Sequence, residues 1–170
     1  MTNKELAAKV KDIALHYKTL YVNGCFGAPL TASNKQRYCN NNDYNRDPSR
    51  QKMIKAASAD TFGFDCVCLI KGVLWGWTGD KSKPYGGAKY ASNGVPDINA
   101  DTMIQKCTGI STNFSKIEIG EALWSAGAYR RVHRVRACSR VYAALEELRA
   151  DNRLQLRQTR LQSPQLVEAW

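Results

Sequence analysis

The sequence predicts an α+β fold, and three observations lead to this prediction. Apolar residues recur near helical spacing over residues 4–20, which indicates an amphipathic helix. An apolar run that suits a buried helix begins at Cys66, and short strand-like segments lie at 21–27 and 117–124. The chain has 170 residues, 44% of them hydrophobic, so it is long and apolar enough to bury the core of one domain.

The N-terminal region is expected to begin with that helix over residues 4–20. Residues 21–27 then form a short strand or turn, because two glycines interrupt the segment. Residues 31–50 are polar and rich in asparagine, and we expect a surface loop there with at most one helical turn. A second, weak helix is expected over residues 52–59.

The middle of the chain contains the strongest helix signal. Asp65 is a suitable N-cap, and the apolar residues after it favour a buried helix that starts at Cys66. Residues 78–100 are rich in Gly, Ser and Pro and are expected to form a loop. A short helix over 101–107 and a strand within 117–124 complete the predicted elements.

The composition limits the possible partners and locations of the protein. The chain carries 25 Lys and Arg residues against 15 Asp and Glu, a formal net charge of +10. This charge favours a polyanionic partner, and nucleic acid, anionic lipid and bacterial wall polymer all stay open. The longest mostly apolar stretch, 66–77, is too short and polar to span a membrane. The first residues lack the apolar core of a signal peptide, so we expect a cytoplasmic protein.

The composition changes abruptly near Ala126. Residues 1–126 contain 13 Lys and 3 Arg, whereas residues 127–170 contain 9 Arg and no Lys. The first part also holds 11 of the 12 glycines. A change of this kind is unusual within one compact domain, so the sequence predicts a domain over 1–126 and a separate Arg-rich tail over 127–170.

Cys66 is the candidate nucleophile. The N–H groups and the dipole at the start of a helix stabilise a thiolate, which is the reactive form of cysteine. Cys68 lies two positions further along, so its side chain is expected to pack inward. Two alternatives stay open from spacing alone: both are small core residues, or both belong to a zinc site, which a C-x-C pair without a nearby histidine supports poorly. The six cysteines are expected to be mostly reduced.

The segment from Gly63 to Ile70 resembles the phenylalanine-aspartate-cysteine-serine-glycine-leucine signature of NlpC-type cell-wall cysteine peptidases. The Tyr21 to Gly24 segment resembles the tyrosine-x-x-glycine segment of that family, and Gly120 to Trp124 resembles the strand that leads to its catalytic histidine. The resemblance covers about residues 5–126. It departs from the family at Val67-Cys68, where Ser-Gly is usual.

The resemblance implies a papain-like fold, in which the helix that carries the nucleophile packs on a small antiparallel sheet. It implies that Cys66 attacks an amide bond of a peptidoglycan stem peptide, that the Cys66 backbone N–H helps to hold the oxyanion, and that Tyr21 lines the site. It implies no metal and no cofactor. Such proteins include phage lysins, which are released to the cell wall from the cytoplasm.

The catalytic histidine that the family supplies is missing from its expected motif. The chain has two histidines, of which His16 lies in the N-terminal helix and is expected to be a surface or packing residue. His133 lies a few residues beyond the expected position and is the remaining candidate for the general base. Positioned acid–base catalysis contributes about 10²–10⁴-fold, so the chain as written is expected to be weakly active or inactive.

A single shift of reading frame would explain both the missing motif and the change to arginine. Permitted codons for Gly127 to Arg134, read one base later, allow alanine-histidine-isoleucine-glycine-valine-tyrosine, which resembles the histidine strand of the family. On this hypothesis residues 127–170 are translated out of frame. Alternatively, residues 141–160 form an Arg-rich helix of a non-catalytic basic module that binds nucleic acid or a wall polymer. Nucleic acid is disfavoured, because aromatic residues do not interleave the arginines.

A third possibility is a papain-like amidase or transferase that acts on another amide substrate. The residues around Cys66 do not distinguish it from a wall peptidase, because substrate specificity depends on loops.

Overall fold

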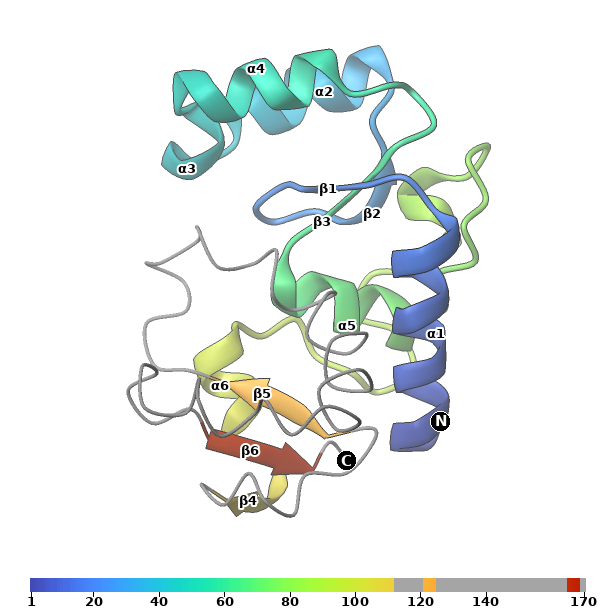
Figure 1. The fold of residues 1–170 in the computed structure, drawn as a ribbon, viewed down its shortest axis with the longest axis vertical. Helices are drawn as coiled ribbons and strands as arrows, with labels where there is room; N and C mark the ends of the chain where they lie inside the picture. Colours follow the sequence, from blue (N-terminus) through green and yellow to red (C-terminus); the bar gives the residue numbers. More distant parts are fainter. Residues whose placement is uncertain (112–120, 125–164, 169–170) are drawn as a thin grey trace, which may run out of the picture. The chain divides into compact units, whose positions relative to one another are not determined.

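The computed structural model describes residues 1–111, 121–124 and 165–168, and these form a mixed α+β structure (Figure 1). The chain divides into a central unit, residues 12–97, and a terminal unit, residues 1–11 and 98–170. The helices are α1 (Asn3–His16), α2 (Ala32–Asn40), α3 (Asp43–Arg46), α4 (Pro48–Ala56), α5 (Cys66–Leu74) and α6 (Ala100–Ile104), with a 3-10 turn η1 (Pro84–Gly87).

The sheet of the central unit is mixed. Its strands are β1 (Thr19–Tyr21), β2 (Phe26–Pro29) and β3 (Phe62–Phe64), in the order β1-β3-β2. β3 pairs with β1 in parallel and with β2 antiparallel. The prediction of an antiparallel sheet beneath the nucleophile helix is therefore wrong, because the helical segment after β2 returns the chain to the centre of the sheet in the direction of β1.

The two faces of this sheet are covered by different elements. In Figure 1, helices α2–α4 lie on one face and α5 lies on the other. The core on the α2–α4 face consists of Val22, Cys25, Ala28, Leu30, Tyr38, Cys39 and Ile54. Helix α5 approaches β2 closely at Gly72, where an added Cβ would lie 2.9 Å from the carbonyl oxygen of Phe26.

An aromatic cluster lies beside α5. Trp77 makes edge contacts with Tyr17, Phe62 and Phe64, at ring-centroid distances of 5.0, 5.0 and 5.4 Å. Its indole N–H donates to the Gly27 carbonyl oxygen over 3.0 Å. Aromatic pairs of this geometry are favourable beyond the area they bury, so the cluster fixes the chain after α5 against β2 and β3.

The expectation of a surface loop over residues 31–50 is wrong, because the segment contains α2, α3 and the start of α4. The polar residues that resembled a loop are N-caps instead. Thr31 accepts from the Asn34 N–H, Asn42 from the Asn45 N–H, and Asp47 from the N–H groups at the start of α4. The weak helix expected at 52–59 is the C-terminal part of α4, which begins at Pro48 and ends at Ala56.

The other predicted elements of the central unit are close to the observed ones. The predicted helix over 4–20 ends at His16, because residues 19–21 form β1. The 21–27 segment joins β1 to β2 through a turn at Gly24, which has a φ of +76°. Residues 78–97 form irregular structure that includes η1.

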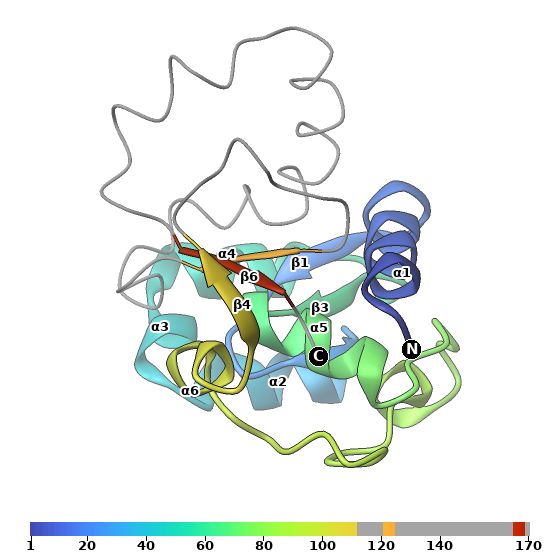
Figure 2. The same cartoon turned by 90° about the horizontal axis from the view of Figure 1, so that it is seen from below.

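The terminal unit contains a second sheet. Its strands are β4 (Thr108–Ser111), β5 (Ala122–Trp124) and β6 (Gln165–Glu168), antiparallel in the order β4-β6-β5 (Figure 2). The strand predicted within 117–124 is therefore confirmed over its last three residues. Of the Arg-rich tail the structure describes only β6, so the helix predicted over 141–160 lies outside the described residues.

None of the helices in the described parts of the chain has the length and hydrophobicity that a membrane crossing requires.

Candidate active site around Cys66

Asp65 caps helix α5, as the sequence predicts, and it also holds a neighbouring turn. One carboxylate oxygen accepts from the Cys68 N–H over 2.6 Å, and the other accepts from the Gly24 N–H over 2.8 Å. The Asp65 N–H in turn donates to the Cys25 carbonyl oxygen over 3.0 Å. These bonds fix the start of α5 against the turn between β1 and β2.

Cys66 is the first residue of α5, and its side chain is half-buried. N–H groups in the first turn of a helix have no acceptor within the helix, and the dipole there favours negative charge. The position of Cys66 therefore favours negative charge on its sulfur. Cys68 is buried, as expected, and burial together with the Asp65 carboxylate raises the pKa of its thiol.

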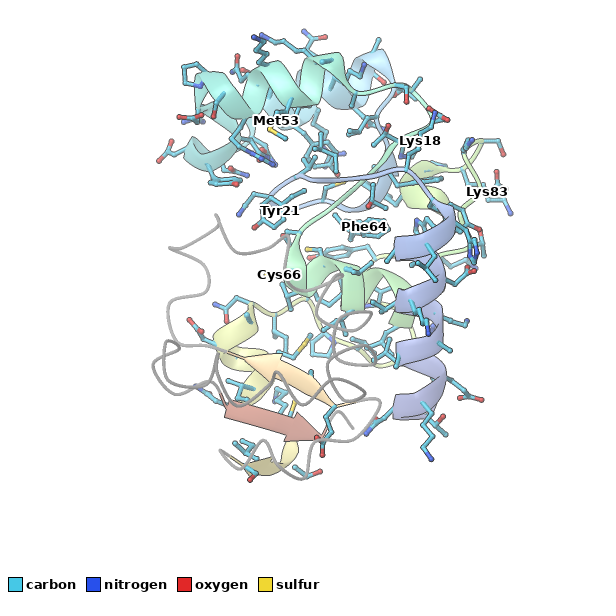
Figure 3. All side chains as sticks on the ribbon, in the orientation of Figure 1. Lys18, Tyr21, Met53, Phe64, Cys66 and Lys83 are labelled. Atoms are coloured by element: carbon cyan, nitrogen blue, oxygen red, sulfur yellow. The ribbon has the colours of Figure 1, made fainter. Side chains whose placement is uncertain are left out.

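Tyr21 lies at the same end of the central sheet as Cys66. It is the last residue of β1 and pairs with Phe64, two residues before Cys66 (Figure 3). Burial raises the pKa of the Tyr21 hydroxyl, and negative charge on Cys66 and Asp65 raises it further. The structure thus brings the two predicted site residues together, and the Tyr21 hydroxyl keeps its proton beside Cys66.

A network of asparagines holds the turn that follows Tyr21. The side-chain oxygen of Asn45, a fully buried residue, accepts from the Asn23 N–H over 3.1 Å. Its amide nitrogen donates to the Asn23 carbonyl oxygen over 3.0 Å. This network could not be predicted from the sequence, because the asparagine-rich segment resembles an ordinary loop and nothing local relates residue 45 to residue 23.

The described residues do not bring a histidine to Cys66. The His16 imidazole is 67% exposed and bonds to Asp12 over 2.7 Å, so His16 is a surface residue, as expected. It precedes Thr19, which pairs with Phe62 at the opposite end of β1 from Tyr21. His133 lies outside the described residues.

The remaining cysteines of the described chain sit in other environments. Burial raises the pKa of the Cys25 thiol to about 11, so this group is poorly nucleophilic at neutral pH. Cys39 is buried against the sheet. Within residues 1–111 and 121–124, and in β6, His, Cys, Asp and Glu side chains form no group of three that would hold a metal ion.

Comparison with known proteins identifies no relative of this chain. No protein-family model matches it, and no curated protein and no solved structure is significantly similar to it.

Proposed function

We propose that the protein is a cysteine hydrolase of the NlpC type, in which Cys66 attacks an amide bond of a peptidoglycan stem peptide. The observation that carries the proposal is the position of Cys66, half-buried at the first residue of an α-helix and beside Tyr21. The Gly63 to Ile70 segment that resembles the family signature contains this cysteine.

The proposed reaction proceeds through the Cys66 thiolate. Its sulfur attacks the carbonyl carbon, and the electron pair of the carbonyl moves to oxygen, where the N–H at the start of α5 stabilises it. Collapse of the intermediate expels the amine, which takes up a proton from water, and leaves a thioester. Water then attacks the thioester, which releases the carboxylic acid and regenerates the Cys66 thiol. In this proposal Cys66 is the nucleophile and the N–H at the start of α5 is the oxyanion donor, whereas the histidine motif that supplies the general base of the family is missing from the sequence. We therefore expect little activity from the chain as written.

Alkylation of the folded protein tests the nucleophile. Iodoacetamide at neutral pH is expected to modify Cys66 well before Cys68, because Cys66 is only half-buried whereas Cys68 is buried and burial raises the pKa of its thiol. Peptide mass spectrometry locates the modification, and unfolded protein is the control in which both cysteines react. Protection of Cys66 in the folded chain would contradict the proposal.

Digestion of purified cell walls tests the substrate. Release of stem-peptide fragments is expected to be slow, and to disappear in Cys66→Ser. Cys68→Ser, matched in residue type, controls for general effects of losing a thiol. A Cys66 that alkylates readily while walls stay intact and another amide substrate is cleaved would favour an amidase of different specificity.

A further inference from the structure

Arg50, in the first turn of α4, contacts the candidate site through Tyr21. Its guanidinium lies over the rings of Tyr21 and Tyr44, at 5.6 and 5.1 Å from the ring centroids. One guanidinium nitrogen also donates to the Tyr21 carbonyl oxygen. The two tyrosine rings meet edge to face at 5.5 Å. Arg50 therefore contacts both the backbone and the ring of Tyr21.

Hydrogen bonds hold helix α3 and the start of α4 in place, so that the contacts of Arg50 with Tyr21 are maintained. Asp47 caps α4 by accepting from the N–H groups of Ser49 and Arg50. The side chain of Asn45, a fully buried residue of α3, forms hydrogen bonds with both the N–H and the carbonyl oxygen of Asn23, two residues after Tyr21. A buried amide is costly unless its hydrogen bonds are satisfied, and the Asn45 side chain satisfies its own through Asn23 and Asn41. The segment from Tyr21 to Asn23 is thus held at both ends by α3 and α4.

We propose that Arg50 is a positioning residue for the site: it sets the ring of Tyr21 beside Cys66 and thereby determines how the thiol is presented to substrate. The inference rests on the proposed function and adds a role for the α2–α4 segment, which the resemblance does not provide. Arg50 contacts Tyr21 and acts on Cys66 only through it. Burial of the Tyr21 hydroxyl near Cys66 and Asp65, which raises its pKa, is consistent with this arrangement.

The test is the alkylation rate of Cys66 in the unaltered chain and in single and double variants. Arg50→Ala and Tyr21→Ala are each expected to change the rate in the same direction, by about two- to fivefold for the loss of a cation–π and hydrogen-bonded contact. If Arg50 acts through Tyr21, the double variant matches Tyr21→Ala, because coupled residues are not additive. Arg50→Lys, which keeps charge and a donor, is expected to restore part of the rate.

Arg46→Ala is the matched control. Arg46 is an arginine of the adjacent helix α3 that contacts Asp43 and the Asn40 carbonyl. Its removal is expected to leave the alkylation rate unchanged. Thermal unfolding of each variant separates a folded but altered site from a loss of structure, and Arg50→Gln serves if Arg50→Ala does not fold.

The possible results distinguish the positioning role of Arg50 from the proposed function and from the proposed substrate. Additive rate effects, or an Arg50→Ala rate equal to that of the unaltered chain while Tyr21→Ala differs, would overturn the positioning role and leave the proposed function intact. A Cys66 that does not alkylate in the unaltered folded chain would overturn both. Non-additive rates together with cleavage of another amide substrate, while cell walls stay intact, would retain the positioning role and refute the proposed substrate.

Discussion

The two oxygens of the Asp65 carboxylate hold different parts of the central unit. One caps α5 at the Cys68 N–H and the other binds the Gly24 N–H in the turn between β1 and β2. Because Asp65 is buried, loss of its side chain would leave two N–H groups without this acceptor. A residue of this kind affects both stability and the position of the neighbouring nucleophile.

We expect Asp65→Ala to lower the free energy of unfolding by about 2–4 kcal/mol, since a cap is lost together with a second, partly buried hydrogen bond. Asp47→Ala is the matched control, because Asp47 caps α4 from an exposed position and its loss is expected to lower the free energy of unfolding less than Asp65→Ala. Urea unfolding measures both values. Equal losses would show that the bond to Gly24 contributes nothing.

Local signals in the sequence predicted the Asp65 cap and the start of α5, because a cap followed by an apolar run determines both. The contacts of Tyr21 with Arg50 were not predictable, since they join residues 29 positions apart. Helix α2 and the start of α4 were missed for a related reason. Their caps are the same polar residues that form loops, and only Tyr38, Cys39 and Ile54 are buried along them.

At the scale of elements, a partly buried ion pair joins α5 to the loop that follows η1. Lys71 of α5 has a side chain only 4% exposed and pairs with Asp97, which is 40% exposed. The Tyr90 hydroxyl donates to the second oxygen of Asp97 over 2.8 Å. The pair therefore ties residues 90–97 to the helix that begins with Cys66.

The pair predicts a dependence of stability on pH. Burial alone would raise the pKa of Asp97, but the hydrogen bonds from Lys71 and Tyr90 outweigh it and lower this pKa. The contribution of the ionised Asp97 carboxylate to stability is therefore complete above the ordinary carboxyl pKa of about 3.9. It is lost as the pH falls through the lower pKa that Asp97 has in the folded protein. We expect the unfolding free energy, measured in urea, to decrease below about pH 4, and to decrease less in Asp97→Asn.

Asp97→Asn is also expected to destabilise the protein at neutral pH by about 1–3 kcal/mol, because it removes the negative charge of Asp97 from the buried Lys71 ammonium. This loss is smaller than for a fully buried pair, since Asp97 is partly in solvent. Adding Lys71→Met is expected to recover most of it. A double variant no more stable than Asp97→Asn would show that the charge is not responsible.

Gly27 tests how closely the Trp77 ring packs on β2. Its φ is +104°, and an added Cβ would lie 2.3 Å from the Trp77 ring. We expect Gly27→Ala to destabilise by more than about 3 kcal/mol, from backbone strain plus steric overlap. Gly76→Ala has a similar φ of +85° with nothing within 4 Å, and strain alone costs about 1–2 kcal/mol. Similar melting temperatures for the two variants would contradict the close packing of Trp77.

At the scale of the whole molecule, the change from lysine to arginine after Ala126 remains the main feature of the sequence to explain. The reading-frame hypothesis makes a direct prediction about the gene. Nucleotide sequencing around the codon for Ala126 is expected to reveal a histidine strand in the shifted frame. A shifted frame without that strand would end the hypothesis.

Restoring the frame is expected to supply the general base and to raise wall hydrolysis by about 10²–10⁴-fold over the chain as written. Cys66→Ser in the restored chain is the control and is expected to abolish the gain. If the chain as written already hydrolyses walls rapidly, the hypothesis of a missing base is wrong. Salt-sensitive DNA binding that survives Cys66→Ala and is lost on deletion of residues 127–170 would favour the basic module instead.

The two ends of the helical segment 31–60 lie next to each other, and this has a consequence for how the sequence of such a protein could change in evolution. The Leu30 N–H donates to the Thr61 carbonyl oxygen over 2.8 Å, and Pro29 pairs with Phe62. The three helices therefore leave and rejoin the scaffold at adjacent points. A different helical segment could replace residues 31–60 between Leu30 and Thr61. Such a replacement could change substrate specificity while Cys66 and its cap, Asp65, stay unchanged.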